Sequence, residues 1–193
     1  MPSPIGHALA GITAGWMICA RGPHPRGAVL ASAVMFGIAA CVPDVDLLVG
    51  LHRGPTHGLG AAAIAGLAAW AACTWVIRRR DGVWVRAVRA GGVGRLALAV
   101  AAAYATHILL DWLGTDTSPP IGVMALWPFS RDFFESRLHL FMAISRRPWL
   151  PDFWSYNLRA VGRELAILLP ALAVVVLVRG RALGGLDPKT LSK

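Results

Sequence analysis

The stretch "AAAIAGLAAWAACTWVI", residues 61–77, decides the class of fold because it contains no charged side chain on any face. A helix in a soluble bundle carries polar and charged residues on the face that meets water. A helix that crosses a bilayer instead needs about 20 predominantly apolar residues. The whole 193-residue chain has the same character, with 15% charged residues and a mean hydropathy of +0.57. Soluble domains carry about 25% charged residues, so the sequence predicts a membrane protein.

Apolar segments of suitable length recur along the whole chain and indicate a single domain, residues 1–193. We expect an all-α polytopic membrane helix bundle of about five spans. Glycine, alanine and serine in the first four spans allow close helix packing. The first and last spans are short, which tilt or local thinning of the bilayer accommodates. The predicted spans are roughly residues 5–20, 27–47, 57–77, 95–113 and 163–179.

Arginine and lysine in the connections predict the orientation, because cytoplasmic loops carry an excess of both. They lie between the first and second spans, between the third and fourth, and after the fifth. The chain is therefore expected to be a multi-pass protein of the inner (plasma) membrane, with connection 43–57 and segment 114–162 facing outward. The basic residues of the predicted cytoplasmic connections are Arg21, Arg26, Arg78, Arg79, Arg80, Arg86, Arg89, Arg95, Arg179, Arg181, Lys189 and Lys193. No recognisable nucleic-acid module accompanies the net charge of +9, so no nucleic-acid partner is expected.

The long outer segment, about residues 114–162, contains the stretch "SRDFFESRLHLFMAISRR", residues 130–147. Phe134, Leu138 and Phe141 recur at the spacing of one helical face. This pattern predicts an amphipathic interfacial helix that lies in the headgroup layer with its apolar face down. Two roles remain open for it: a lid or brace for the bundle, or a surface that faces the substrate.

Ionisable residues gather near the outer ends of four predicted spans, and intramembrane acids and histidines mark functional sites. The stretch "CVPDVDLLVGLHRGPTHG", residues 41–58, supplies half of them, and His107 and Asp111 share a helical face four residues apart. Imidazoles and carboxylates together suit a divalent metal, above all Zn²⁺. Six candidates exceed the ligands of one catalytic ion, so either two ions bind or some members orient ligands or act as bases. The predicted metal ligands are His7, Asp44, Asp46, His57, His107 and Asp111.

Each candidate also has a purely structural interpretation. Asp44 could cap a helix, and His107 with Asp111 could form a structural hydrogen bond. His57 could be an interface residue, and His7 lies close to the terminus. Their convergence at one depth argues against all of these at once.

Other polar residues are assigned individually. Arg53, beside the cluster, offers the forked donor that a phosphate or carboxylate substrate needs. Glu164 either serves the site or pairs with Arg159 or Arg163. Outside the site, His52 and His139 are expected at the surface and His24 on the cytoplasmic side.

Five short motifs, in order along most of the chain, resemble those of the YdjM-like family (DUF457). Its members are described as membrane-bound metal-dependent hydrolases, or LexA-binding, inner membrane-associated hydrolases. The resemblance implies metal binding through the six histidine and aspartate positions given above. The motifs are "GHALAG" at 6–11, "VPDVD" at 42–46, "HRGPTHG" at 52–58, "THILLDWLGT" at 106–115 and "LWPFS" at 126–130.

The predicted function is a metal-dependent hydrolase that cleaves a phosphoester of a lipid or lipid-linked substrate at the outer face through metal-activated water. An aspartate not bound to the metal (Asp44 or Asp46) or Glu164 would act as the base, and Arg53 would stabilise charge on the phosphoryl oxygens. The chain lacks the HExxH and GxSxG motifs of zinc proteases and serine hydrolases. The alternative is a non-enzymatic membrane transporter or metal-binding membrane protein. Against transport, the inner halves of the spans are apolar and no inverted repeat is visible.

Overall fold

The computed structural model describes residues 1–19, 26–50, 53–80, 82, 85, 88–89, 91–117 and 119–180. Within these ranges the regular structure is helical, and only isolated β-bridges interrupt the irregular segments. The α-helices are α1 (Pro4–Cys19), α2 (Arg26–Cys41), α3 (Leu59–Arg79), α5 (Val93–Trp112) and α6 (Phe153–Arg179). Two 3₁₀ helices, η1 (Val42–Val49) and η2 (Pro55–His57), lie between α2 and α3.

Four helical segments are long and apolar enough to cross a membrane, and α1 is a shorter apolar helix of 16 residues. The predicted all-α membrane helix bundle is therefore confirmed. The largest difference concerns α6, which begins at Phe153 and not near residue 163. Its first turns contain polar residues such as Asn157 and Arg159, which hydropathy excludes from a span although they are compatible with a helix. At 1.5 Å per residue, α6 is about 40 Å long, which exceeds the hydrocarbon thickness of about 30 Å.

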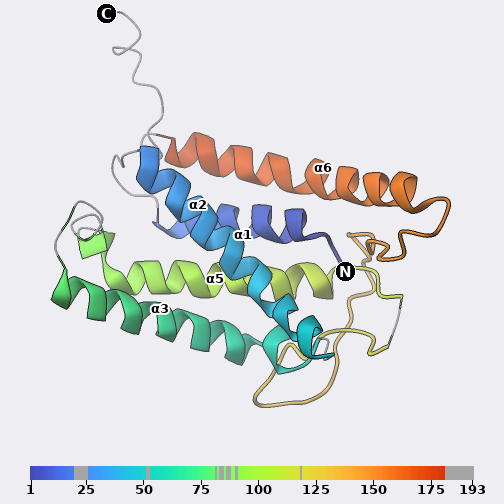
Figure 1. The fold of residues 1–193 in the computed structure, drawn as a ribbon, viewed down its shortest axis with the longest axis horizontal. Coiled ribbons are helices and arrows are strands. Elements are labelled where there is room, and N and C mark those ends of the chain that lie inside the picture. Colours follow the sequence, from blue (N-terminus) through green and yellow to red (C-terminus); the bar gives the residue numbers. More distant parts are fainter. Residues whose placement is uncertain are drawn as a thin grey trace, which may run out of the picture.

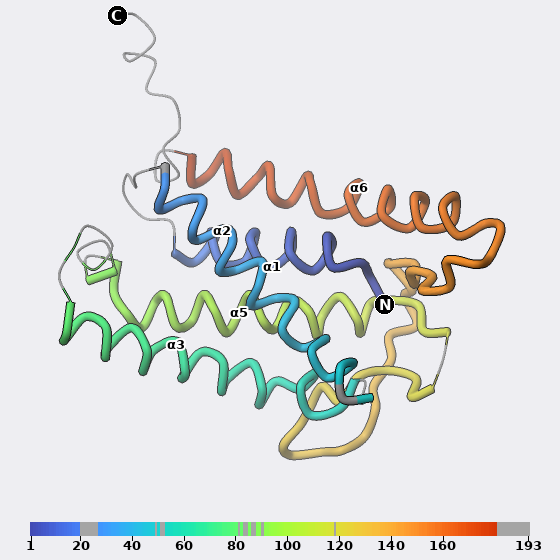
Figure 2. Tube along the Cα trace, viewed as in Figure 1, coloured from blue at the N-terminus to red at the C-terminus, as the bar shows by residue number. Residues whose placement is uncertain are grey.

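Helix α5 occupies the centre of the bundle, in contact with α1, α2 and α3, and α6 packs against α1 (Figure 1). The Cα trace shows α3 and α6 on opposite sides of the bundle (Figure 2). Small residues permit the close approach of the helices. A Cβ at Gly66 of α3 would lie 2.9 Å from the Ala101 side chain of α5. A Cβ at Gly11 of α1 would lie 2.6 Å from the carbonyl oxygen of Phe36 in α2.

The prediction of an amphipathic helix within residues 130–147 is wrong, because this segment is irregular. Its backbone is bonded to other parts of the outer end. Phe134 exchanges backbone hydrogen bonds with Val123, and the Ser136 N–H donates to the carbonyl of Trp112 at the end of α5. Phe141 is 2% exposed but Leu138 is 66% exposed, so the two do not share a buried face. These non-local bonds override the local helical spacing.

Basic residues lie at the end of the bundle opposite to η1 and η2. Arg78 and Arg79 end α3, Arg95 lies in the first turn of α5, and Arg179 ends α6. Five of the residues used to predict the orientation lie outside the described ranges: Arg21, Arg86, Arg181, Lys189 and Lys193. The described arginines of the predicted cytoplasmic connections thus share one end, as the predicted topology requires, and the cytoplasmic assignment of that end stays a prediction.

Candidate metal centre

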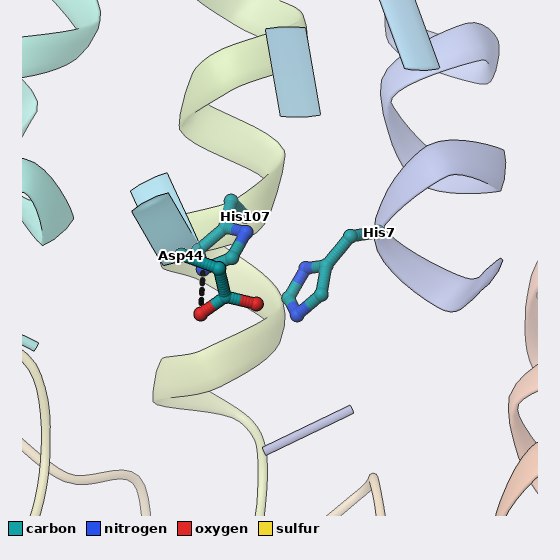
Figure 3. Close-up of side chains that lie close together, drawn as sticks. All are labelled: His7, Asp44 and His107. Atoms are coloured by element: carbon teal, nitrogen blue, oxygen red, sulfur yellow. Dashed lines mark ion pairs between the residues drawn. The ribbon is translucent and has the colours of Figure 1, made fainter. Parts of the chain in front are cut away.

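The six predicted metal ligands come together at one end of the bundle. His7 lies in α1, the two aspartates of "VPDVD" lie in η1, His57 ends η2, and His107 with Asp111 lies in the last turns of α5. Figure 3 shows the side chains of His7, Asp44 and His107 lying close together. Three overlapping groups could each hold a metal ion: His7, Asp44 and His107; His57, His107 and Asp111; and Asp44, Asp46 and His57.

Three donor atoms have the mutual spacing of a single coordination shell: His57 Nε2, His107 Nε2 and Asp111 Oδ2. Asp44 Oδ1 approaches both imidazoles and completes what we call the four-donor set. The two imidazole nitrogens are 3.1 Å apart, and each is 3.7 Å from Asp44 Oδ1. Asp111 Oδ2 lies 3.5 Å from His57 Nε2 and 3.3 Å from His107 Nε2. Ligands at about 2.0–2.2 Å from a tetrahedral ion are about 3.4 Å from one another. The spacing therefore fits a divalent ion such as Zn²⁺.

His107 is oriented by the backbone of α2. Its Nδ1 lies 2.7 Å from the carbonyl oxygen of Ala40, and a carbonyl can only accept, so Nδ1 carries the proton. In a neutral ring, Nε2 then presents its lone pair to the other donors. Fixing the tautomer of a ligand histidine through its remote nitrogen is typical of metal sites.

His57 is oriented in the same way by Thr56 and Asp46. The Thr56 hydroxyl donates to Asp46 Oδ2 at 2.8 Å and lies 3.0 Å from His57 Nδ1, which is itself 3.3 Å from Asp46 Oδ2. The Tyr104 hydroxyl fixes the position of Thr56 by donating to the Thr56 carbonyl at 2.7 Å. Burial opposes charge on the ring, but the carboxylates of Asp44 and Asp46 outweigh it and raise the pKa of His57 to about 9. The cluster therefore attracts positive charge.

In the described part of the chain, several buried polar atoms of the cluster have no hydrogen-bond partner and are free to bind a cation. Within the described residues, both ring nitrogens of His7, Asp44 Oδ1 and both oxygens of Asp111 are buried without a hydrogen bond. An unsatisfied buried polar atom costs about 1–3 kcal/mol, and such groups in native proteins call for an explanation such as a bound ion. The donor set therefore fits a divalent metal on its own chemistry.

His7 contacts Asp111 at Oδ1, the carboxylate oxygen that does not face the two ligand imidazoles. Its Nε2 lies 3.4 Å from Asp111 Oδ1. The ring stacks on His107 with centroids 3.8 Å apart and planes inclined by 17°. Asp111 thus contacts His7 through Oδ1 and the two ligand imidazoles through Oδ2.

Glu164 bonds to Ser3 and, within the described part of the chain, forms no ion pair with the metal cluster or with the two arginines considered as its partners. Its Oε1 accepts the Ser3 N–H at 2.7 Å, and its Oε2 accepts a short hydrogen bond from the Ser3 hydroxyl. Ser3 Oγ in turn accepts the N–H of Gly6, capping the first turn of α1. Arg159 and Arg163 donate instead to backbone carbonyls. Glu164 thereby fixes the turn of α1 that carries His7.

Arg53 is held by an acid that the sequence did not single out as its partner. Its guanidinium lies 2.6 Å from Asp116 Oδ1 and donates to the Pro120 carbonyl at 2.7 Å. Both side chains are almost fully buried. Its predicted contact with a phosphoryl group stays a prediction.

The remaining histidines lie outside the cluster. His139 is exposed, as expected. His24 and His52 lie outside the described residues. The orienting residues that sequence reasoning missed are Ser3 and Thr56, although Ser3 before Pro4 is a helix-start signal and Thr56 directly precedes His57.

A bundle of long apolar helices with a buried histidine–aspartate cluster at one end defines a helical membrane protein with a candidate metal site. The chain belongs to the family of YdjM inner membrane proteins, whose family model matches residues 1–183. No curated protein and no solved structure matches the chain. The resemblance seen in the sequence motifs is thus confirmed at the level of the family.

Proposed function

We propose that this protein is a membrane-embedded metal-dependent hydrolase that cleaves a phosphoester of a lipid or lipid-linked substrate. The observation that carries the proposal is the four-donor set at one end of an apolar bundle. Donor atoms of His57, His107 and Asp111 are 3.1–3.5 Å apart, and Asp44 lies 3.7 Å from both imidazoles. Two imidazoles and one carboxylate, with a position left open for water, suit Zn²⁺ or a similar divalent ion. Such an ion supplies Lewis acidity that activates water and polarises a phosphoryl oxygen.

The residues around the set divide the remaining tasks. Ala40 and the Thr56–Asp46 pair keep Nε2 of each ligand histidine directed into the site. Asp44 has 21% of its side chain exposed, whereas the side chains of His57, His107 and Asp111 are at most 1% exposed. We therefore assign to Asp44, as a carboxylate not bound to the metal, the side from which water and substrate enter and the acceptance of a proton. His57, His107 and Asp111 are then the ligands. Both oxygens of Glu164 are occupied by Ser3, which disfavours it as the base.

The position of the site supports a lipid substrate. We propose a multi-pass topology with the site facing outward, because the described arginines that end α3 and α6 lie at the opposite end. Exposed aromatic side chains accompany the site end: Phe129, Trp149 and Trp154. Tryptophan is typical of the membrane–water interface. A cluster at this depth meets the headgroups of lipids.

The test is metal analysis of the purified protein, followed by a panel of lipid phosphoesters with and without chelator. His107→Ala should lose the metal and hydrolysis together, whereas His139→Ala, an exposed histidine outside the cluster, should keep both. A His107→Ala protein with unchanged metal content would contradict the site. Metal binding without any phosphoester hydrolysis, combined with ion movement across reconstituted vesicles, would favour a transporter in place of a hydrolase.

A further inference from the structure

A cavity lies at the same end of the bundle, outside the metal cluster. It has a volume of about 390 Å³ and lies between the first residues of the chain, the segment 143–147 and the start of α6. Met1 forms part of its wall, and Pro2 lies against Gly114, three residues after Asp111. Charged and hydroxyl-bearing side chains also line the cavity, among them Arg53, Arg146, Arg147, Ser145, Tyr156 and Asp152.

The wall of this cavity is fixed to the bundle from two sides. Asn157 of α6 accepts the Ser145 N–H at 2.7 Å and donates to the Ser145 carbonyl at 3.0 Å. One residue earlier, the Ile144 N–H donates to the Met1 carbonyl at 3.0 Å. The irregular segment that carries Arg146 and Arg147 is therefore positioned before any ligand arrives, which lowers the ordering cost of binding.

The charges at the cavity favour an anion. Arg53 is neutralised by Asp116. Arg146 and Arg147 form no ion pair within the described residues, and Asp152 is the one acid among the lining side chains. Two guanidinium groups against one carboxylate leave positive charge at the opening. Tyr156 and Ser145 add hydroxyl groups at the wall.

We propose that this cavity binds a phosphate group through Arg146 and Arg147. A guanidinium presents parallel N–H donors that match two oxygens of a phosphate. The Ser145 hydroxyl accepts the backbone N–H of Arg147 at 3.3 Å and keeps its own hydrogen for a ligand oxygen. The cavity lies at the end where the lipid headgroups and the adjoining solution are expected. The phosphate therefore belongs either to a lipid headgroup or to a small molecule in solution. This site does not depend on the metal centre.

The experiment uses the full-length protein, treated with chelator and held in a phosphate-free maltoside detergent. One arm titrates inorganic phosphate by calorimetry. The other titrates dihexanoyl-phosphatidylglycerol, with dihexanoylglycerol as the ligand that lacks a phosphate. Arg146→Ala/Arg147→Ala is compared with the exposed pair Arg131→Ala/Arg137→Ala, which does not line the cavity. Arg146→Lys/Arg147→Lys keeps the charge without the forked donors.

We expect saturable binding in at least one arm, weakened at least about tenfold by the alanine pair at 146 and 147 and less than about twofold by the control pair. The lysine pair should fall between wild type and the alanine pair. Binding of the lipid alone assigns the phosphate to a headgroup, and binding of inorganic phosphate assigns it to a soluble ligand. Absence of saturable binding in both arms, equal effects of the two alanine pairs, or no loss with either pair would overturn the proposal.

Discussion

Thr56 shows most clearly how a single side chain organises the candidate site. It donates to Asp46 and accepts from the remote nitrogen of His57. It therefore couples a carboxylate to a ligand histidine without itself approaching the four-donor set.

Replacing Thr56 should weaken metal binding while leaving the fold intact. Thr56→Val removes the hydroxyl but keeps the shape and the carbonyl that accepts from Tyr104. Loss of such an orienting partner lowers metal affinity about 10–100-fold. Competition with a chromophoric chelator measures this. Thr106→Val is the matched control, because the Thr106 hydroxyl donates to the Ala103 carbonyl of its own helix. An equal effect of both changes would contradict the role of Thr56.

His7 provides a second prediction at the scale of single residues. It contacts Asp111 Oδ1, while the four-donor set uses Oδ2. His7→Ala should therefore leave one ion bound, whereas Asp111→Ala should remove it. Elemental analysis gives the ratio of metal to protein. A His7→Ala protein free of metal would show that His7 is required for the first ion.

Among the elements, α1 matters because it delivers His7 and contacts α2, α5 and α6. Its first turn is tied to α6 through Ser3 and Glu164. Its middle lies so close to α2 that glycine is needed at position 11.

Glu164→Ala should lower thermal stability more than Glu164→Gln does. Alanine leaves the Ser3 N–H and hydroxyl without a partner in a buried place, which costs about 1–3 kcal/mol for each donor. Glutamine keeps one oxygen to accept. Thermal unfolding in detergent measures the difference. If Glu164 acted as the base instead, both variants would lose turnover equally with little change in the unfolding temperature.

Gly11→Ala should force α1 and α2 apart. A Cβ there would lie 2.5 Å from the Ala40 Cβ, and overpacking of this kind costs about 1–3 kcal/mol. The matched change is Gly162→Ala in α6, where a Cβ meets nothing within 4 Å and a gain of about 0.5–1 kcal/mol is expected. Denaturation midpoints of the two variants should move in opposite directions, and a fall in both would count against the packing argument.

For the whole molecule, the separation of the two ends is the main organising feature. The candidate metal centre and the cavity lie at the end that carries η1, η2 and the irregular segment before α6. The described arginines that end α3 and α6 lie at the other end.

The proposed topology predicts which end a membrane-impermeant thiol reagent reaches in intact cells. With Cys19, Cys41 and Cys73 replaced by serine, Ser130→Cys in the segment between α5 and α6 should be labelled from outside. Arg79→Cys at the end of α3 should be labelled only after the cells are opened. The reverse pattern would place the metal centre on the cytoplasmic side.

Much of the fold could be predicted from the sequence because hydropathy acts locally. Segments such as 61–77 have no charged face, so they indicate helices in a membrane without knowledge of their neighbours. The six candidate ligands could be proposed for the same reason, since ionisable groups in apolar segments are costly and must have partners. The family follows from motifs that are contiguous in the chain.

The tertiary structure decided what depends on contacts between distant residues. It made segment 130–147 irregular, because its backbone bonds to Val123 and to the end of α5. It assigned Glu164 to Ser3 and Arg53 to Asp116, pairs separated by long stretches of chain. Local spacing determines which residues can form a helix or a site, but the partner that satisfies each buried polar group is set only when the helices pack.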